Sequence, residues 1–176
     1  MLYYYHYIMS SKRIILGIDP GLADLGWGII QEDKNKLSLV DYASIKTKSH
    51  TKLIERLIII YDELLKVIQK YMPTEVAIEE LFFGKNAKTA MMVGEARGVV
   101  MLLLAQNKYQ PIEFKPSEIK ISLTGYGNAD KKQVQTMVQR ILKLKSIPKP
   151  DDAADALAIA LTLFFSNPVL INKINI

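Results

Sequence analysis

Four acidic residues stand where predicted secondary-structure elements end or begin. Asp19 closes one short apolar run and Glu79 closes a second, while Asp152 and Asp155 open the last predicted helix. Carboxylates that are brought together raise one another's pKa, and bound cations commonly offset the repulsion. Because oxygen-only ligands suit Mg²⁺ or Mn²⁺, this pattern indicates a metal-dependent enzyme.

Each acidic residue also has an ordinary structural explanation. Asp19 precedes a Pro-Gly pair and is a common type of turn residue. The two helix aspartates, with Asp151 beside them, can cap the helix and complement its dipole. Glu79 is harder to explain in this way, because carboxylates seldom end a buried strand without a partner. Its neighbour Glu80 should point to the opposite face of the strand, where it is solvated or supports the site.

Composition restricts the possible classes of protein. The chain has 176 residues, of which 49% are hydrophobic, so we expect one globular domain. It has no cysteine, which excludes disulfide scaffolds, zinc ribbons and thiol nucleophiles, and its two histidines, His6 and His50, do not suggest a metal site or a catalytic triad. The net charge of +5 favours a polyanionic partner and an ordinary lysine-rich surface about equally. No apolar run reaches the length of about 18 residues that a membrane span needs.

Hydrophobic patterning predicts an α/β domain with a mixed five-stranded sheet flanked by helices. In chain order it predicts strands at 14–18, 26–31 and 37–43, a helix at 53–71, a strand at 75–79, a helix at 87–106, a strand at 111–114, and helices at 117–123, 131–144 and 152–165. The first three strands form an antiparallel meander. Residues 13–165 make up the single domain, residues 1–12 are either a disordered extension or precede a start at Met9, and residues 166–176 form a tail without an assigned role.

The predicted topology brings the acidic residues toward one edge of the sheet. Right-handed crossovers place the first, fourth and fifth strands parallel and side by side, so Asp19 and Glu79 end neighbouring strands. Ligand sites of open α/β sheets lie at this carboxyl edge. Asp152 and Asp155 are three residues apart on one helical face, and both can point at a single spot.

Such a cluster suits the hydrolysis of a phosphodiester. Two cations about 4 Å apart activate a water molecule and stabilise the leaving oxygen. In this hypothesis Asp19 bridges the two metal ions, Glu79 and Asp155 are flanking ligands, and Asp152 ligates a metal ion or orients the attacking water.

Seven sequence motifs, spread in order over residues 14–165, match one known family. They are Leu16-Gly17-Ile18-Asp19-Pro20-Gly21, Ala77-Ile78-Glu79-Glu80-Leu81-Phe82, Lys85-Asn86-Ala87, Gly94-Glu95-Ala96-Arg97-Gly98, Gly125-Tyr126-Gly127, Lys131-Lys132-Gln133-Val134-Gln135 and Asp152-Ala153-Ala154-Asp155-Ala156-Leu157-Ala158. The chain resembles the RuvC Holliday-junction resolvases, which have a ribonuclease H-like fold.

The resemblance implies a Mg²⁺-dependent homodimer that nicks opposed strands of a four-way DNA junction during recombination and repair. Its catalytic and metal-binding quartet falls on Asp19, Glu79, Asp152 and Asp155. We expect two Mg²⁺ ions in each active site, with Mn²⁺ as a substitute. The family resemblance further implies that the protein works with the RuvA–RuvB branch-migration complex. The absence of cysteine fits a reducing cytosol, so we expect a cytoplasmic protein.

Five residues are candidates for DNA binding. Phe82 follows Glu79 by three residues and matches a family residue that stacks on an unpaired base, although phenylalanine more often packs in a core. Lys120 and Lys131 match family lysines that contact the phosphate backbone. Lys85 and Lys132 are further candidates, and any of the four lysines is equally compatible with a solvated surface.

Small residues at four-residue spacing, Ala90, Gly94 and Gly98, allow another backbone to come close. They either pack on the sheet or, as the resemblance implies, form a dimer interface. Three other functions stay open: an RNA-processing nuclease like the related YqgF group, a non-catalytic binder of branched DNA, and an actin-like ATPase, for which the chain is too short.

Overall fold

A mixed five-stranded sheet forms the centre of the protein. The computed structural model describes residues 12–34, 36–81 and 87–166. The sheet contains β1 (Arg13–Asp19), β2 (Asp24–Asp33), β3 (Lys36–Lys46), β4 (Glu75–Glu79) and β5 (Ile112–Phe114), in the spatial order β3-β2-β1-β4-β5. β1, β2 and β3 are antiparallel, whereas β1, β4 and β5 are parallel. This order and these directions confirm the predicted mixed sheet.

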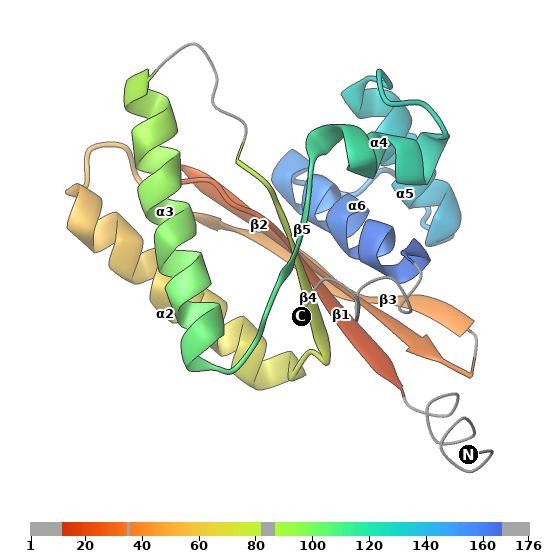
Figure 1. Ribbon diagram of the computed structural model, residues 1–176, viewed down its shortest axis with the longest axis horizontal. Coiled ribbons are helices and arrows are strands. Elements are labelled where there is room, and N and C mark those ends of the chain that lie inside the picture. Colours follow the sequence, from red (N-terminus) through yellow and green to blue (C-terminus); the bar gives the residue numbers. More distant parts are fainter. Residues whose placement is uncertain (1–11, 35, 82–86, 167–176) are drawn as a thin grey trace, which may run out of the picture.

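Helices cover both faces of the sheet (Figure 1). They are α2 (Leu53–Tyr71), α3 (Ala87–Gln106), α4 (Pro116–Thr124), α5 (Lys131–Ile141) and α6 (Asp151–Phe165). α2 and α3 lie together on one face, and α6 lies on the other with α4 and α5 packed against it. None of these helices, within the described residues, is long and apolar enough to cross a membrane.

The strand β1 is buried on both faces because helices cover it from both sides. Ile15, Leu16 and Ile18 are completely inaccessible to solvent. Leu16 and Ile18 pack in the core beneath α2 and α3, and Ile15 packs in the second core beneath α6. A strand buried on both faces has a continuous apolar sequence. Because β1 lies at the middle of the sheet, its last residue, Asp19, is placed by the neighbouring strands β2 and β4.

Two boundaries differ from the sequence-based prediction. β2 and β3 are longer than predicted, because their ladder continues through the polar residues down to the pair Asp33 and Lys36. The helix α5 ends at Ile141 rather than at residue 144. There Lys143 takes a left-handed backbone conformation, with φ of 53°, which ends the helix.

Glycines in β1 and β2 allow α6 to lie directly on the sheet. A Cβ atom added to Gly17 would lie 2.1 Å from the carbonyl oxygen of Ala156, and one added to Gly26 would lie 1.9 Å from the carbonyl oxygen of Asp152. Real Cβ atoms essentially never come within 3.0 Å of such atoms. The absence of side chains at these positions therefore sets how close the start of α6 comes to the end of β1.

Candidate active site

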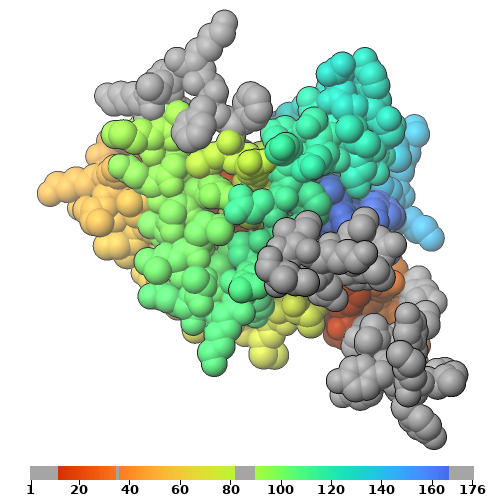
Figure 2. Space-filling view, in the orientation of Figure 1, coloured from red at the N-terminus to blue at the C-terminus, as the bar shows by residue number. Residues whose placement is uncertain are grey.

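Two carboxylate side chains lie at the same edge of the sheet. β1 and β4 are parallel neighbours in which Ile18 pairs with Ile78, so the next residues, Asp19 and Glu79, end adjacent strands. Both side chains are half-buried. In the space-filling view the end of β4 lies between the surfaces of α3 and α4 (Figure 2). The predicted placement of these two residues at one carboxyl edge is confirmed.

Two further carboxylates come from the first turns of α6, which packs across β1 and β2. The residue that caps this helix is Pro150, whose side chain makes no capping hydrogen bond. Asp152 and Asp155 lie inside the helix rather than at its N-cap position. The alternative that these aspartates cap the helix is therefore wrong, although Asp152 still lies in the first turn, where a negative charge complements the helix dipole.

Three of the four carboxylates open into one cavity of about 210 Å³. It is lined by Asp19, Glu79, Pro116, Ile119, Lys120, Lys131, Val134, Asp155, Ala158 and Ile159. Asp152 is not among the lining residues, but its charge acts on Asp19. All four carboxylates, from three separate segments of the chain, thus surround the end of β1.

Crowding of negative charge changes the acidity of these groups. Burial, followed by repulsion from Glu79, Asp155 and Asp152, raises the pKa of Asp19 to about 8. Burial and then the charge of Asp155 raise the pKa of Glu79 as well. With a pKa of about 8, Asp19 retains at neutral pH a proton that an isolated carboxyl group would have lost, and a bound cation would favour its release.

One cation of the chain already lies at the cluster. The Lys131 ammonium is 2.6 Å from Oδ2 of Asp155, and its charge also opposes the raised pKa of Asp19 and Glu79. Burial raises the pKa of Asp155, and the hydrogen bond from Lys131 works against that rise. Lys120 lines the same cavity, and its charge lowers the pKa of Glu79. Two of the four lysines predicted to bind DNA, Lys120 and Lys131, therefore line the cavity of the carboxylates.

The donor chemistry of this cluster fits a divalent cation. Its ligating atoms are all carboxylate oxygens, which Mg²⁺ prefers, and the repulsion at Asp19 is the kind that a bound cation relieves. As the side chains stand, no three acidic or histidine residues in the described part of the chain are arranged closely enough to hold a metal ion. The contact between Lys131 and Asp155 explains part of this arrangement, because the ammonium occupies one carboxylate oxygen.

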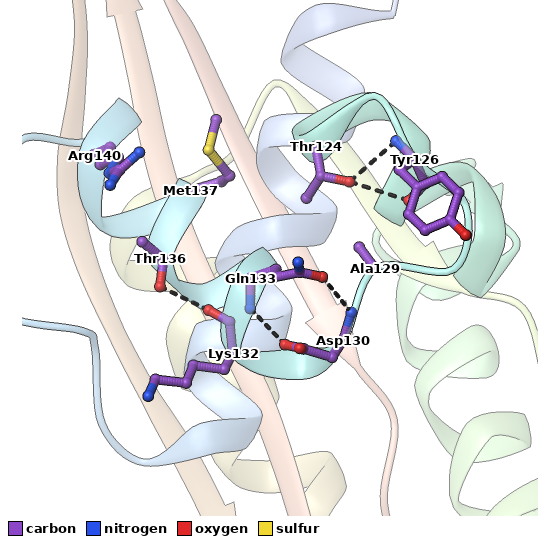
Figure 3. Close-up of a pocket in the computed structure, with 9 residues that line it drawn as sticks. All are labelled: Thr124, Tyr126, Ala129, Asp130, Lys132, Gln133, Thr136, Met137 and Arg140. Carbon is purple, nitrogen blue, oxygen red and sulfur yellow. Dashed lines mark hydrogen bonds between the residues drawn. The ribbon is translucent and has the colours of Figure 1, made fainter.

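The start of α5 determines where Lys131 points. Asp130 accepts a hydrogen bond from the backbone N–H of Gln133, and the Gln133 side chain accepts one from the backbone N–H of Asp130 (Figure 3). This reciprocal cap fixes the first turn of the helix. Lys131 then faces α6, whereas Lys132 lines a different cavity of about 390 Å³ beside the α4–α5 loop. The two consecutive lysines therefore serve different surfaces.

The remaining candidates divide into exposed residues and residues outside the described ranges. Glu80 is exposed, and its backbone N–H donates to the backbone carbonyl oxygen of Phe114. Asp151 pairs with Lys149 at the surface, and that contact lowers the pKa of Asp151. Phe82 and Lys85 lie outside the described residues.

Comparison with known proteins identifies the family. The family model for crossover junction endodeoxyribonuclease RuvC matches residues 15–163. The chain belongs to the RuvC family. A RuvC protein from Roseiflexus sp. is 49% identical over 162 residues, which cover 92% of this chain and 96% of that protein. A second, from Fusobacterium nucleatum, is 53% identical over 148 residues, or 84% of this chain and 78% of that protein.

A solved structure gives the same result. The structure of T. thermophilus RuvC in complex with a Holliday junction substrate is 36% identical to this chain, has a TM-score of 0.81, and matches 87% of this chain and 93% of its own. The ribonuclease H-like fold that the sequence predicted is confirmed.

Sequence reasoning missed the residues that position the four carboxylates without carrying charge. Gly17 and Gly26 hold no functional group, yet they set the approach of α6. A glycine within a predicted strand often marks a place where another backbone comes close, and that signal was present in the sequence. The contact of Lys131 with Asp155 had no sequence signal, because the two residues are 24 positions apart and the rotation of α5 decides it.

Proposed function

We propose that this protein is a structure-selective endodeoxyribonuclease that resolves four-way DNA junctions by paired, metal-dependent nicks of opposed strands in recombination and repair. The observation that carries the proposal is the meeting of Asp19, Glu79, Asp152 and Asp155 around the end of β1, where burial and then the charges of the other three carboxylates raise the pKa of Asp19 to about 8. Membership of the RuvC family and the likeness to a relative bound to a Holliday junction support the choice of substrate.

The four carboxylates are the proposed metal ligands and catalytic residues. They would hold two Mg²⁺ ions, with Mn²⁺ as a substitute, because both cations accept oxygen-only ligands. When bound, such a pair of ions activates a water molecule and stabilises the leaving oxygen of a phosphodiester. Asp19 is central to the group and is the proposed bridging ligand, with Glu79 and Asp155 beside it, while Asp152 ligates an ion or orients the attacking water.

The basic residues near the cavity are the proposed DNA contacts. Lys120 and Lys131 line the same cavity as Asp19, so a phosphate that reaches the carboxylates also meets two ammonium groups. Lys132 would contact a neighbouring part of the backbone from the other side of α5. Lys85 and Phe82 are proposed, from the family resemblance, to bind the backbone and to stack on an unpaired base.

We further propose a homodimer, because two opposed nicks need two active sites related by a two-fold axis. Gly98 of α3 is exposed, and an added Cβ atom there would meet nothing within 4 Å in the described structure. It therefore does not pack on the sheet, which leaves it open to a second chain. From the resemblance to the RuvC family we also propose RuvA–RuvB as partners. The proposed site of action is the cytoplasm, where the proposed DNA substrate lies.

The decisive experiment compares substitutions at the quartet with a neighbouring control. We expect Asp152→Asn and Glu79→Gln to bind a synthetic four-way junction as the wild type does and to lose nicking in Mg²⁺. Glu80→Gln is the matched control, because this residue is adjacent to Glu79 but exposed, and it should nick at the wild-type rate. Undiminished nicking by Asp152→Asn would remove that residue from the mechanism. Preferential cleavage of structured RNA over junction DNA would favour the RNA-processing alternative.

A further inference from the structure

Gln135 is a buried polar residue that the quartet does not include. It lies on α5, its side chain is only 6% exposed, and its amide nitrogen Nε2 makes no hydrogen bond within the described part of the chain. Buried polar groups are nearly always hydrogen-bonded, because leaving one unpaired costs stability. An amide kept in such a place therefore calls for a functional explanation.

The surroundings of this amide point toward the active site. Gln135 follows Lys131 by four residues, so the two side chains lie on the same face of α5, one turn apart. That face packs against α6, where Lys131 contacts Asp155. The Gln135 amide lies near the carboxyl groups of Asp151 and Asp155 and favours their charged forms, although its Nε2 stands outside hydrogen-bonding geometry with either of them. Since both carboxylates are hydrogen-bond acceptors, we expect the NH₂ group of the Gln135 amide, rather than its oxygen, to face them.

Lys131 and Gln135 on α5 should respond differently to a cation bound at the carboxylates. The Lys131 ammonium, which is half exposed, would be repelled by a bound divalent cation and is long enough to turn toward a DNA phosphate instead. Gln135 is neutral and buried, so the same cation does not drive it away. A neutral donor behind a ligating carboxylate is the usual arrangement around protein metal sites, where it orients the ligand.

We propose that Gln135 is a positioning residue that holds the Asp155 carboxylate in its metal-binding orientation once a bound cation has displaced Lys131 from it. The inference rests on the proposed function, because it concerns the same metal site. It assigns the two donors of α5 separate tasks. Lys131 neutralises Asp155 before metal and DNA bind, and Gln135 orients the carboxylate afterwards.

The test uses Gln135→Met, which keeps the length and volume of the side chain and removes the donor. Loss of such a supporting contact typically weakens metal binding or activity by about 10- to 100-fold. We expect this loss in a titration of the DNA-free protein with Mn²⁺, followed by electron paramagnetic resonance. The melting temperature should stay the same or rise, because an unpaired buried amide has been replaced by an apolar group. In the nicking assay we expect a lower kcat with an unchanged KM for the junction.

Gln139→Met is the matched control, one turn further along the same helix. Its amide donates to the carbonyl oxygen of Leu144 at 3.4 Å, away from the carboxylates. We expect it to change the melting temperature at most and to leave Mn²⁺ affinity unaltered. Wild-type Mn²⁺ affinity in Gln135→Met would overturn the proposal. If that variant does not fold, Gln135→Asn keeps the amide but withdraws it by one methylene, and the same loss of affinity is expected.

Asp155→Asn separates failure of this inference from failure of the proposed function. If Asp155→Asn loses Mn²⁺ binding and nicking while Gln135→Met keeps both, only the role of Gln135 is wrong. If Asp155→Asn keeps both properties, the proposed metal site itself is wrong.

Discussion

Gly26→Ala tests whether the strand glycines set the working distance between α6 and the sheet. The added Cβ atom would lie 1.9 Å from the carbonyl oxygen of Asp152, and reaching the 3.0 Å limit requires a retreat of about 1.1 Å. Asp152 and Asp155 move with their helix, so both leave Asp19. Because a misplacement of about 1 Å costs on the order of 100-fold in rate, we expect nicking to fall by about that factor or more.

The same substitution should also destabilise the protein moderately. Overpacking a core typically costs about 1–3 kcal/mol. For a domain of this size that corresponds to a fall in melting temperature of roughly 2–12 °C. The protein should therefore remain folded at 25 °C, and the rate can be measured on folded molecules by single-turnover nicking of a four-way junction in Mg²⁺.

Gly28→Ala is the matched control, because Gly28 lies in the same strand under the same helix. Its added Cβ atom would meet mainly the side chain of Leu157, with the nearest atoms at 2.7 Å, and the backbone nitrogen of Leu157 at 3.1 Å, which is a much smaller intrusion on the α6 backbone than the 1.9 Å contact at Gly26. A leucine side chain can change rotamer, so we expect a similar loss of stability with a much smaller loss of rate. Equal rates for Gly26→Ala and the wild type, or equal losses for the two variants, would refute the argument that Gly26 positions the site.

Two further predictions follow from the charges and the exposed surface. In the absence of divalent cations, folded Asp19 has a pKa of about 8 against 3.8 for the solvent-exposed group of an unfolded chain, so the folded state binds more protons and the free energy of unfolding falls as pH rises from about 4 to 8. In urea denaturation with EDTA, the free energy of unfolding of Asp19→Asn should therefore equal that of the wild type near pH 4. Near pH 8 it should exceed the wild-type value by a few kcal/mol, on the order expected for a pKa shift of this size. A difference between the two proteins that does not change with pH would contradict this assignment. Gly98→Leu should leave the stability of a single chain unchanged or raise it by up to about 1 kcal/mol, because the position is open and glycine disfavours helix. If α3 pairs across the dimer, sedimentation should show weaker dimerisation, and an unaltered dimer would place the interface elsewhere.

The sheet topology could be predicted because it depends on local patterns and one general rule. Apolar runs predicted the strands, and right-handed crossovers placed β1 beside β4. This topology places Asp19 and Glu79 at the same edge of the sheet, independently of their side-chain conformations. The quartet itself was predicted by these placements together with the resemblance to a family.

The contacts within the site could not be predicted in the same way. Helical spacing shows which residues share a face of α5, but the rotation of that face toward α6 depends on the cap at Asp130 and on packing over the whole helix. The pairing of Lys131 with Asp155 follows from that rotation. Similarly, a glycine such as Gly26 signals a close approach without showing which segment approaches.

The repulsion at the carboxyl edge should push α6 away from β1, so the rest of that helix must hold it in place. Four large apolar side chains further along α6 are at most 1% exposed: Leu157, Ile159, Leu161 and Leu163. Burial of each contributes about 1.5–3 kcal/mol, or roughly 6–12 kcal/mol together, which exceeds the few kcal/mol that the raised pKa of Asp19 represents. The charged end of the helix can therefore remain strained because its apolar end is anchored. It follows that a cavity made at Leu161, two turns from the cluster, should weaken metal binding as well as stability, since it loosens the element that opposes the repulsion.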